Sequence, residues 1–228
     1  MATDIIKPNE ELKKNFAYLN VLDEKQIDRL VVENGITWVV HLSALLSAAG
    51  ERNFDAAFNV NIIGAKNILE SARHHKLRVY SPSSIAAFGP TTPLDFVPDV
   101  TIQRPTTIYG ISKVFLEHLG EYYNLKWGVD FRSLRYPGII SASPPGGGTT
   151  DYAVEIFFEG LKSGKYECFL KEDTPLPMMY MPDCIKATVD FLTAPEESLK
   201  QRTYNIAGLF FPSLCFLTHS FYSCSRSV

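Results

Sequence analysis

The first 34 residues of this 228-residue sequence contain no glycine. Dinucleotide-binding folds hold a pyrophosphate on a glycine-rich turn after their first strand, so this segment does not provide such a turn. The only run of glycines, residues 146–148, directly follows two prolines. We interpret this run as a flexible loop and not as a phosphate-binding turn.

The sequence also has few cysteines, no long apolar run and no large excess of one charge. The four cysteines lack metal-site spacing and are too few for a disulfide framework, so we expect no metal and a reducing compartment. No run of about 18 apolar residues occurs, which indicates that no helix spans a membrane. A net charge of −3 provides no basic surface for nucleic acid. The first residues resemble neither a secretory signal nor a transit peptide, so we expect no targeting segment.

Apolar segments alternate with amphipathic ones along much of the chain. We expect strands at residues 16–21, 36–42, 77–81 and 129–134, and helices at 23–34, 53–75 and from 109 onwards. Residues 4–15 and 90–105 are expected to be loops. This alternation indicates an α/β fold with a doubly wound parallel sheet. Ligands bind such sheets at the carboxyl ends of the strands, so residues that follow strands are the functional candidates.

Tyr109 and Lys113 stand four residues apart at the start of the third expected helix. Four residues is slightly more than one helical turn, so both side chains leave the same face. A phenol is a weak base at neutral pH unless a neighbouring cation favours the phenolate, and a lysine provides that cation. The pair is a candidate proton-transfer site, although by itself this spacing is more often an exposed helix face that carries both residues by chance.

Small and hydroxyl-bearing residues follow three of the expected strands. The segments are 41–50 (HLSALLSAAG), 81–84 (SPSS) and 135–141 (RYPGIIS). Each has an ordinary structural explanation, because serines cap turns and Pro-Gly pairs punctuate loops. Their shared position at strand ends favours one ligand site to which all three segments contribute.

These segments resemble the extended short-chain dehydrogenases/reductases, the branch that contains the nucleotide-sugar epimerases. Residues 41–48, 82–90, 135–141, 148–154 (GTTDYAV) and 176–181 (LPMMYM) are similar to the short-chain-type L-threonine 3-dehydrogenases within that family. The resemblance covers roughly residues 16–208. It implies a partial NAD-binding Rossmann domain over residues 1–142 that lacks its first β-α-β unit. A partial substrate lobe over 143–208 and an atypical tail over 209–228 would follow.

The resemblance implies NAD-dependent oxidation of L-threonine to 2-amino-3-oxobutanoate. Tyr109 would be the base, Lys113 would lower the pKa of Tyr109 and bind the nicotinamide ribose, and Ser84 would hold the reacting oxygen. The implied NAD contacts are Asn20, Val21, Leu42, Tyr109, Lys113 and Ile139. The implied L-threonine contacts are Ser47, Ser83, Ser84, Thr149 and Thr150. A homodimer formed by the helices at 53–75 and 109–126 and, as in animal relatives, a mitochondrial location are implied too.

Two departures from the family pattern leave alternatives open. Members begin with the glycine-rich turn and carry an acidic residue on the next strand that binds the adenosine ribose, and we expect this sequence to begin after both. The tail 209–228 is rich in Phe, Ser and Cys and has no helical periodicity. The alternatives are a nucleotide-sugar epimerase or dehydratase with the same Tyr-Lys chemistry, and a catalytically inactive fragment.

Two further residues near the expected site have mainly structural interpretations. Arg135 lies at a strand end, where an arginine more often forms a structural ion pair than binds a substrate carboxylate. His41 lies at the end of another strand, and we expect it to be packed and hydrogen-bonded.

Overall fold

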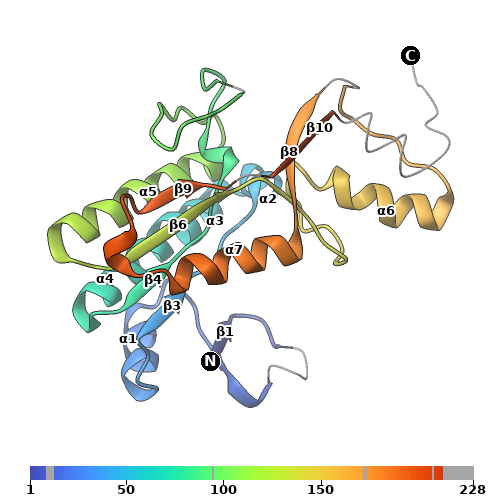
Figure 1. Ribbon diagram of the computed structural model, residues 1–228. Helices are drawn as coiled ribbons and strands as arrows, with labels where there is room; N and C mark the ends of the chain where they lie inside the picture. The colour runs from blue at the N-terminus through green and yellow to red at the C-terminus, as the bar shows by residue number, and fades with distance from the viewer. Residues whose placement is uncertain (9–12, 94, 172–173, 207, 213–228) are drawn as a thin grey trace.

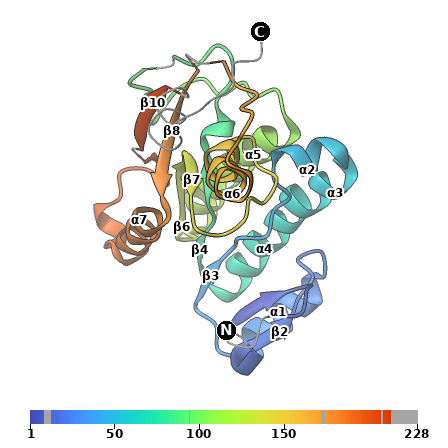
Figure 2. The ribbon, with the colours of Figure 1, turned by 90° about the vertical axis from the view of Figure 1, so that its right-hand side faces the viewer.

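Parallel strands with helices on both sides make up most of the computed structural model (Figures 1 and 2). It describes residues 1–8, 13–93, 95–171, 174–206 and 208–212. The α/β fold with parallel sheets that the sequence predicts is confirmed.

The main sheet is built around strand β6 (Phe131–Tyr136). Its other strands are β3 (Trp38–Val40), β4 (Arg78–Tyr80), β5 (Ser83–Ser84) and β9 (Thr203–Asn205). Strand β6 pairs with β4, β5 and β9, β3 pairs with β4, and every pairing is parallel. The register places Ser83 beside Arg135 and Ser84 beside Tyr136. The expected strands at 36–42, 77–81 and 129–134 correspond to β3, β4 and β6.

Two smaller sheets flank the main one. Strands β1 (Ala2–Asp4) and β2 (Phe16–Tyr18) form a parallel pair, and a single 3₁₀ turn, Lys13–Asn15, precedes β2. Strand β1 was not predicted, because three residues do not show a periodic pattern and its order comes from pairing with β2. Strands β7 (Gly138–Ile140), β8 (Pro175–Tyr180) and β10 (Leu209–Pro212) form the other sheet. The expected tail therefore begins with a paired strand, and residues 213–228 lie outside the described part of the chain.

Helices cover both faces of the main sheet (Figure 2). Helices α1 (Glu24–Glu33), α4 (Ala65–His75) and α5 (Ile108–Trp127) lie on one side, and α7 (Met181–Thr193) lies on the other. The remaining helical elements are α2 (Ser47–Arg52), α3 (Phe54–Phe58), a π-helical segment Asn59–Gly64, α6 (Tyr152–Ser163) and the 3₁₀ turns Ile85–Ala87 and Glu196–Ser198. The single helix expected at 53–75 is thus α3, the π-helical segment and α4 in succession.

The predicted helix boundaries have visible causes. Asp23 accepts a hydrogen bond from the backbone of Gln26 and begins α1, and Gly35, with φ of +57°, follows its end. Thr107 begins α5 in the same way by accepting from the backbone of Gly110, and Gly128, with φ of +69°, ends it. These caps confirm the predicted helices at 23–34 and from 109 onwards.

Residues of the central strands alternate between two hydrophobic cores. Val79 and Phe131 pack with α1, α4 and α5, whereas Tyr80 and Leu134 pack with α7. Successive side chains of a strand point to opposite faces, so Arg135 lies on the α5 side of the sheet. This alternation decides which residues of β6 reach the candidate site.

Candidate active site

The first turn of α5 packs closely against the 3₁₀ turn that follows β5. A Cβ atom on Gly110 would lie 2.2 Å from the carbonyl oxygen of Ala86 and 2.6 Å from the Cβ of Pro105. Only glycine permits this approach. The contact brings Tyr109, the neighbour of Gly110, to the end of strand β5 at Ser84.

The structure brings the three predicted catalytic residues together. The Ser84 hydroxyl faces the phenol of Tyr109. The ammonium of Lys113 lies 5.4 Å from the centroid of the Tyr109 ring and donates a hydrogen bond of 2.6 Å to the carbonyl oxygen of Pro82. Tyr109 and Lys113 thus share one face of α5, and that face lies against segment 82–84.

Burial shifts the pKa values of both Tyr109 and Lys113. It raises the pKa of the Tyr109 phenol, and the hydrogen bond with Ser84 opposes that shift. Burial also lowers the pKa of Lys113 to about 8, against the raising effect of the Glu117 carboxylate. The net pKa of Tyr109 is therefore raised by burial, and the expected lowering effect of Lys113 stays a prediction.

A cavity of about 620 Å³ opens in front of these side chains. The predicted site residues that line it are Ser47, Ser83, Ser84, Tyr109, Lys113, Ile139, Thr149 and Thr150. They come from five separate segments of the chain: the first turn of α2, strand β5, helix α5, strand β7 and the loop before α6. The segments that follow the expected strands thus meet at one cavity.

Three predicted NAD contacts lie elsewhere. Asn20 and Val21 follow β2, and Leu42 follows β3; none of them lines the cavity. Val21 is buried and its carbonyl oxygen accepts a hydrogen bond from Asn67, whereas 66% of Leu42 is exposed. All three follow the carboxyl ends of parallel strands.

Asp4 changes the expectation about the acidic residue. It is the last residue of β1, so a carboxylate stands at the carboxyl end of a strand parallel to β2. Asp4 is therefore a candidate for the acidic position that we expected to be missing. Asp4 also accepts a hydrogen bond of 3.0 Å from the backbone of Ile6.

Other predicted features have clear structural surroundings. The backbone N–H groups of Gly147 and Gly148 each donate 2.7 Å hydrogen bonds to the Asp151 carboxylate, so they already bind an internal anion. His41 is buried, its carbonyl oxygen accepts from Ser81, and burial and then the Lys113 charge lower its pKa to about 4. This environment agrees with a packed histidine.

Two residues that support the site were missed by sequence reasoning. Asn61, in the π-helical segment, accepts from the Leu45 N–H and donates to the Leu45 carbonyl, at 2.8 and 3.0 Å, which fixes the segment before Ser47. Glu117 forms a buried ion pair with Arg135 at 2.8 Å, so Arg135 is structural, as expected. The spacing of Tyr109, Lys113 and Glu117 at successive turns would have identified Glu117.

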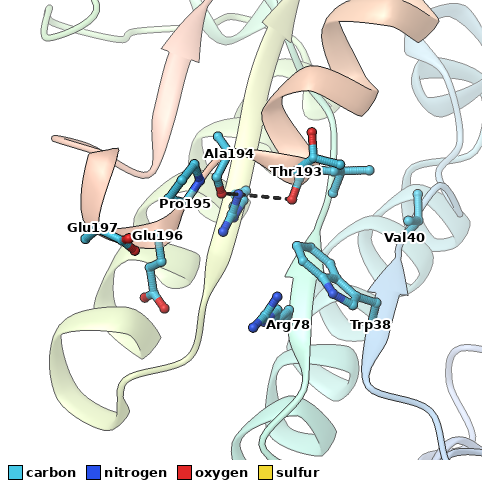
Figure 3. A pocket seen from close by; sticks show the side chains of 10 residues that line it. Trp38, Val40, Arg78, Thr193, Ala194, Pro195, Glu196 and Glu197 are labelled. Atoms are coloured by element: carbon cyan, nitrogen blue, oxygen red, sulfur yellow. Dashed lines mark hydrogen bonds between the residues drawn. The ribbon is translucent and has the colours of Figure 1, made fainter.

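A second cavity, of about 680 Å³, lies away from this site. Figure 3 shows Trp38 and Arg78 beside residues 193–197, a segment that begins at the last residue of α7. The Trp38 ring has the guanidinium carbon of Arg78 5.2 Å and that of Arg132 5.4 Å from its centroid. None of the predicted site residues lines this cavity, so the Tyr109 cavity is the candidate active site.

Within the described residues, no three His, Cys, Asp or Glu side chains are grouped so that they could hold a metal ion. Cys168 and Cys184 are free cysteines, and the other two cysteines lie outside the described residues. The helices in that part of the chain are also too short or too polar to cross a membrane.

The model of the NAD-dependent epimerase/dehydratase family matches residues 3–207. The chain belongs to this family. Mitochondrial L-threonine 3-dehydrogenase from Bos taurus is 57% identical over 212 residues, which are 92% of this chain and 57% of the bovine protein. The chain thus spans somewhat more than half the length of that relative.

Solved structures of family members have the same fold. L-threonine dehydrogenase from Phytophthora infestans has a TM-score of 0.91 and 52% identity, with 97% of this chain and 74% of that chain covered. The holo form of a GalE-like L-threonine dehydrogenase from Cupriavidus necator has a TM-score of 0.89 and 48% identity, with 93% and 70% covered. The family resemblance predicted from the sequence is confirmed.

Proposed function

We propose that the chain oxidises L-threonine to 2-amino-3-oxobutanoate with NAD as the oxidant. The observation that carries this proposal is the meeting of Tyr109, Ser84 and Lys113 at one cavity with the hydroxyls of Ser47, Thr149 and Thr150. The names of the bovine and Phytophthora infestans relatives support the choice of substrate.

Proton transfer falls to Tyr109. Its phenolate oxygen accepts the proton of the substrate 3-hydroxyl as the C3 carbon becomes a carbonyl, and Ser84 donates a hydrogen bond to the same substrate oxygen. When bound, NAD supplies the hydride acceptor. The proton and the hydride together account for the two hydrogens that the alcohol loses.

The residues around the cavity fit the nicotinamide end of NAD. Lys113 is a buried cation at the cavity wall, and its ammonium has donors beyond the one bonded to Pro82. Ribose hydroxyls are suitable acceptors for such a donor. Ile139, on β7, provides an apolar side chain at the same wall for the nicotinamide ring.

The adenosine end would lie at the strands of the N-terminal side. Asn20, Val21 and Leu42 follow β2 and β3, and Asp4 ends β1. A carboxylate accepts two hydroxyl hydrogen bonds, so Asp4 is suited to the diol of the adenosine ribose. The pyrophosphate has no glycine-rich turn in the described residues, because Gly147 and Gly148 bind Asp151.

The amino-acid head group of L-threonine would be bound by hydroxyls. Ser47, Thr149 and Thr150 line the cavity from two segments, and Ser83 contributes its oxygen because its hydrogen is donated to Glu117. Arg135 is not a carboxylate ligand here, because its guanidinium binds Glu117, Asp99 and Asn205.

We also propose a homodimer and a mitochondrial location. Helices α3 and α5 expose apolar side chains, with 58% of Phe54, 48% of Ile111 and 79% of Leu125 accessible. Ile111, Tyr122 and Leu125 fall on one stripe of α5, which is suited to an antiparallel or parallel helix contact. The location follows the names of the bovine and porcine relatives.

The test is NADH formation by the purified chain with L-threonine. We expect turnover by wild type and by Tyr180→Phe, an exposed tyrosine that does not line the cavity, and none by Tyr109→Phe. A nucleotide-sugar substrate, UDP-galactose, is assayed in parallel. Turnover of UDP-galactose without threonine-dependent NADH formation would favour the epimerase alternative. A folded chain that shows no activity on either substrate would favour a catalytically inactive fragment.

A further inference from the structure

Three successive turns of α5 contact the three residues of segment 82–84, although not in the order of the sequence. Lys113 donates to the carbonyl oxygen of Pro82 at 2.6 Å, and Glu117, one turn further along α5, accepts a hydrogen bond from the hydroxyl of Ser83. Tyr109, one turn before Lys113, faces the next residue of the segment, Ser84. Residues four apart lie on one face of a helix, so the three α5 side chains form one stripe that faces the segment.

Glu117 is the most enclosed member of this stripe. Only 3% of Glu117 is exposed, and its two carboxylate oxygens accept hydrogen bonds from four donors. Arg135 provides two of them, at 3.0 and 2.8 Å, and Gln103 provides one at 2.8 Å. The fourth donor is the hydroxyl of Ser83, the residue between the Lys113 contact and the Tyr109 contact.

A buried ion pair alone does not explain this arrangement. Burying two charges costs desolvation free energy that their attraction barely offsets. An apolar pair between α5 and β6 would therefore stabilise the fold to a similar extent. An apolar side chain at position 117 would leave the Ser83 hydroxyl unpaired. The carboxylate therefore has a specific function in holding the strand end.

We propose that Glu117 is a positioning residue for the Tyr109 site. Through Ser83 it fixes segment 82–84 along α5, in the register that places Ser84 against Tyr109 and the Pro82 carbonyl against Lys113. Successive residues of an extended segment point to opposite sides, so rotation or slippage of Ser83 displaces Ser84. The inference rests on the proposed function, because this register matters for turnover only if Tyr109 and Ser84 act on the substrate.

Lys113 reports on this register without any turnover. The titratable groups that face it are Glu117 and Tyr109 from α5 and His41 from the end of β3, and Arg135 faces Glu117 from β6. The Pro82 carbonyl stabilises the charged form of Lys113 by accepting its hydrogen bond. If segment 82–84 shifts, that acceptor is lost and the titration midpoint of Lys113 falls.

The decisive variant is Ser83→Ala, because it removes the link to Glu117 and leaves every charge in place. The matched control is Ser71→Ala, since Ser71 is also buried and donates to a carboxylate, that of Asp28 at 2.7 Å, away from the site. The Lys113 midpoint is followed by NMR of ¹³C-labelled lysine and assigned with Lys113→Arg. We expect wild type and Ser71→Ala to titrate near pH 8 and Ser83→Ala to titrate lower.

Kinetics provide the second readout. We expect Ser83→Ala to lower kcat about tenfold, because misplacement of a reacting group affects the chemical step. Loss of the Ser83 oxygen should also raise KM for L-threonine, whereas Glu117→Gln keeps that oxygen and should leave KM nearly constant. Glu117→Gln should lower kcat further, and the double variant should be no slower than Glu117→Gln, since both changes break one link. Glu121→Gln, one turn further on the exposed side of α5, should match wild type.

A folded Ser83→Ala variant with the Lys113 midpoint and kcat of wild type would overturn the proposal. If Glu117→Gln does not fold, Ser83→Ala still decides the question on its own. If the wild-type chain does not oxidise L-threonine, the proposed function fails, and the Lys113 midpoint alone then supports or overturns the positioning role.

Discussion

The ammonium of Lys113 donates a hydrogen bond of 2.6 Å to the carbonyl oxygen of Pro82, while the ring of Tyr109 lies 5.4 Å away. The lysine is thus held by the backbone at a strand end, between the phenol and the Glu117 carboxylate. Its charge is partly lost near pH 8, because burial lowers its pKa to about that value. Burial raises the pKa of the Tyr109 phenol above its ordinary value.

The first prediction concerns the pH dependence of turnover. Because the base form of Tyr109 is the phenolate and burial raises its pKa, threonine oxidation should increase with pH throughout the range from about 8 to 10. The measurement is kcat against pH, with the stability of the protein checked at each value. A plateau that is complete below pH 8 would contradict this assignment of the base.

The second prediction concerns His41 and acid stability. Its folded pKa of about 4 lies below the ordinary 6.5, so the unfolded chain binds more protons between these values and the free energy of unfolding rises with pH there. The difference corresponds to about 3 kcal/mol, which is lost as the pH falls from 6.5 to 4. Urea unfolding of wild type and His41→Gln at both pH values measures it. The same pH dependence in both proteins would contradict the prediction.

The third prediction concerns Asp4. If its carboxylate binds the adenosine ribose diol, Asp4→Asn should weaken NAD binding about tenfold, because hydrogen bonds to a charged acceptor contribute about 1.5–3 kcal/mol. Asp55→Asn, in the first turn of α3, is the control. Equal NAD affinities for the two variants would exclude Asp4 from the cofactor site.

The fourth prediction concerns the dimer. Leu125 is 79% exposed on α5, and a charge there would be buried without a partner in the proposed interface. Leu125→Glu should weaken association by about 2 kcal/mol or more, as expected at the centre of an interface. Val100→Glu, at an equally exposed loop position, should not. Light scattering over a range of concentrations distinguishes them, and a monomeric wild type would contradict the proposal.

The sequence predicted the parts of the fold that depend on local signals. Asp23 and Gly35 bound the helix predicted at 23–34 through a hydrogen bond and a dihedral angle that these residue types favour, and the structure has both. Strands β1 and β5 have only three and two residues and were missed. Their order comes from pairing with β2 and β6, which no local pattern contains.

The candidate site shows the same division. The cavity that contains Tyr109, Lys113 and Ser84 follows from strand ends and helix spacing. The raised pKa of Tyr109 does not, because burial depends on residues distant in the sequence. Glu117 could have been found from its spacing to Lys113, whereas its bond to Ser83 depends on how α5 packs against β5.

Calorimetric titration of the chain with NAD measures the cofactor binding on which the proposed function depends. We expect one NAD per chain, an affinity reduced about tenfold or more by Lys113→Met, and no change with Lys126→Met at the exposed end of α5. If neither L-threonine analogues nor the Lys113→Met substitution changes the NAD affinity, NAD binds outside the Tyr109 cavity. No detectable binding of millimolar NAD by the folded wild type would contradict the proposed function and favour a chain that does not act as an NAD-dependent enzyme.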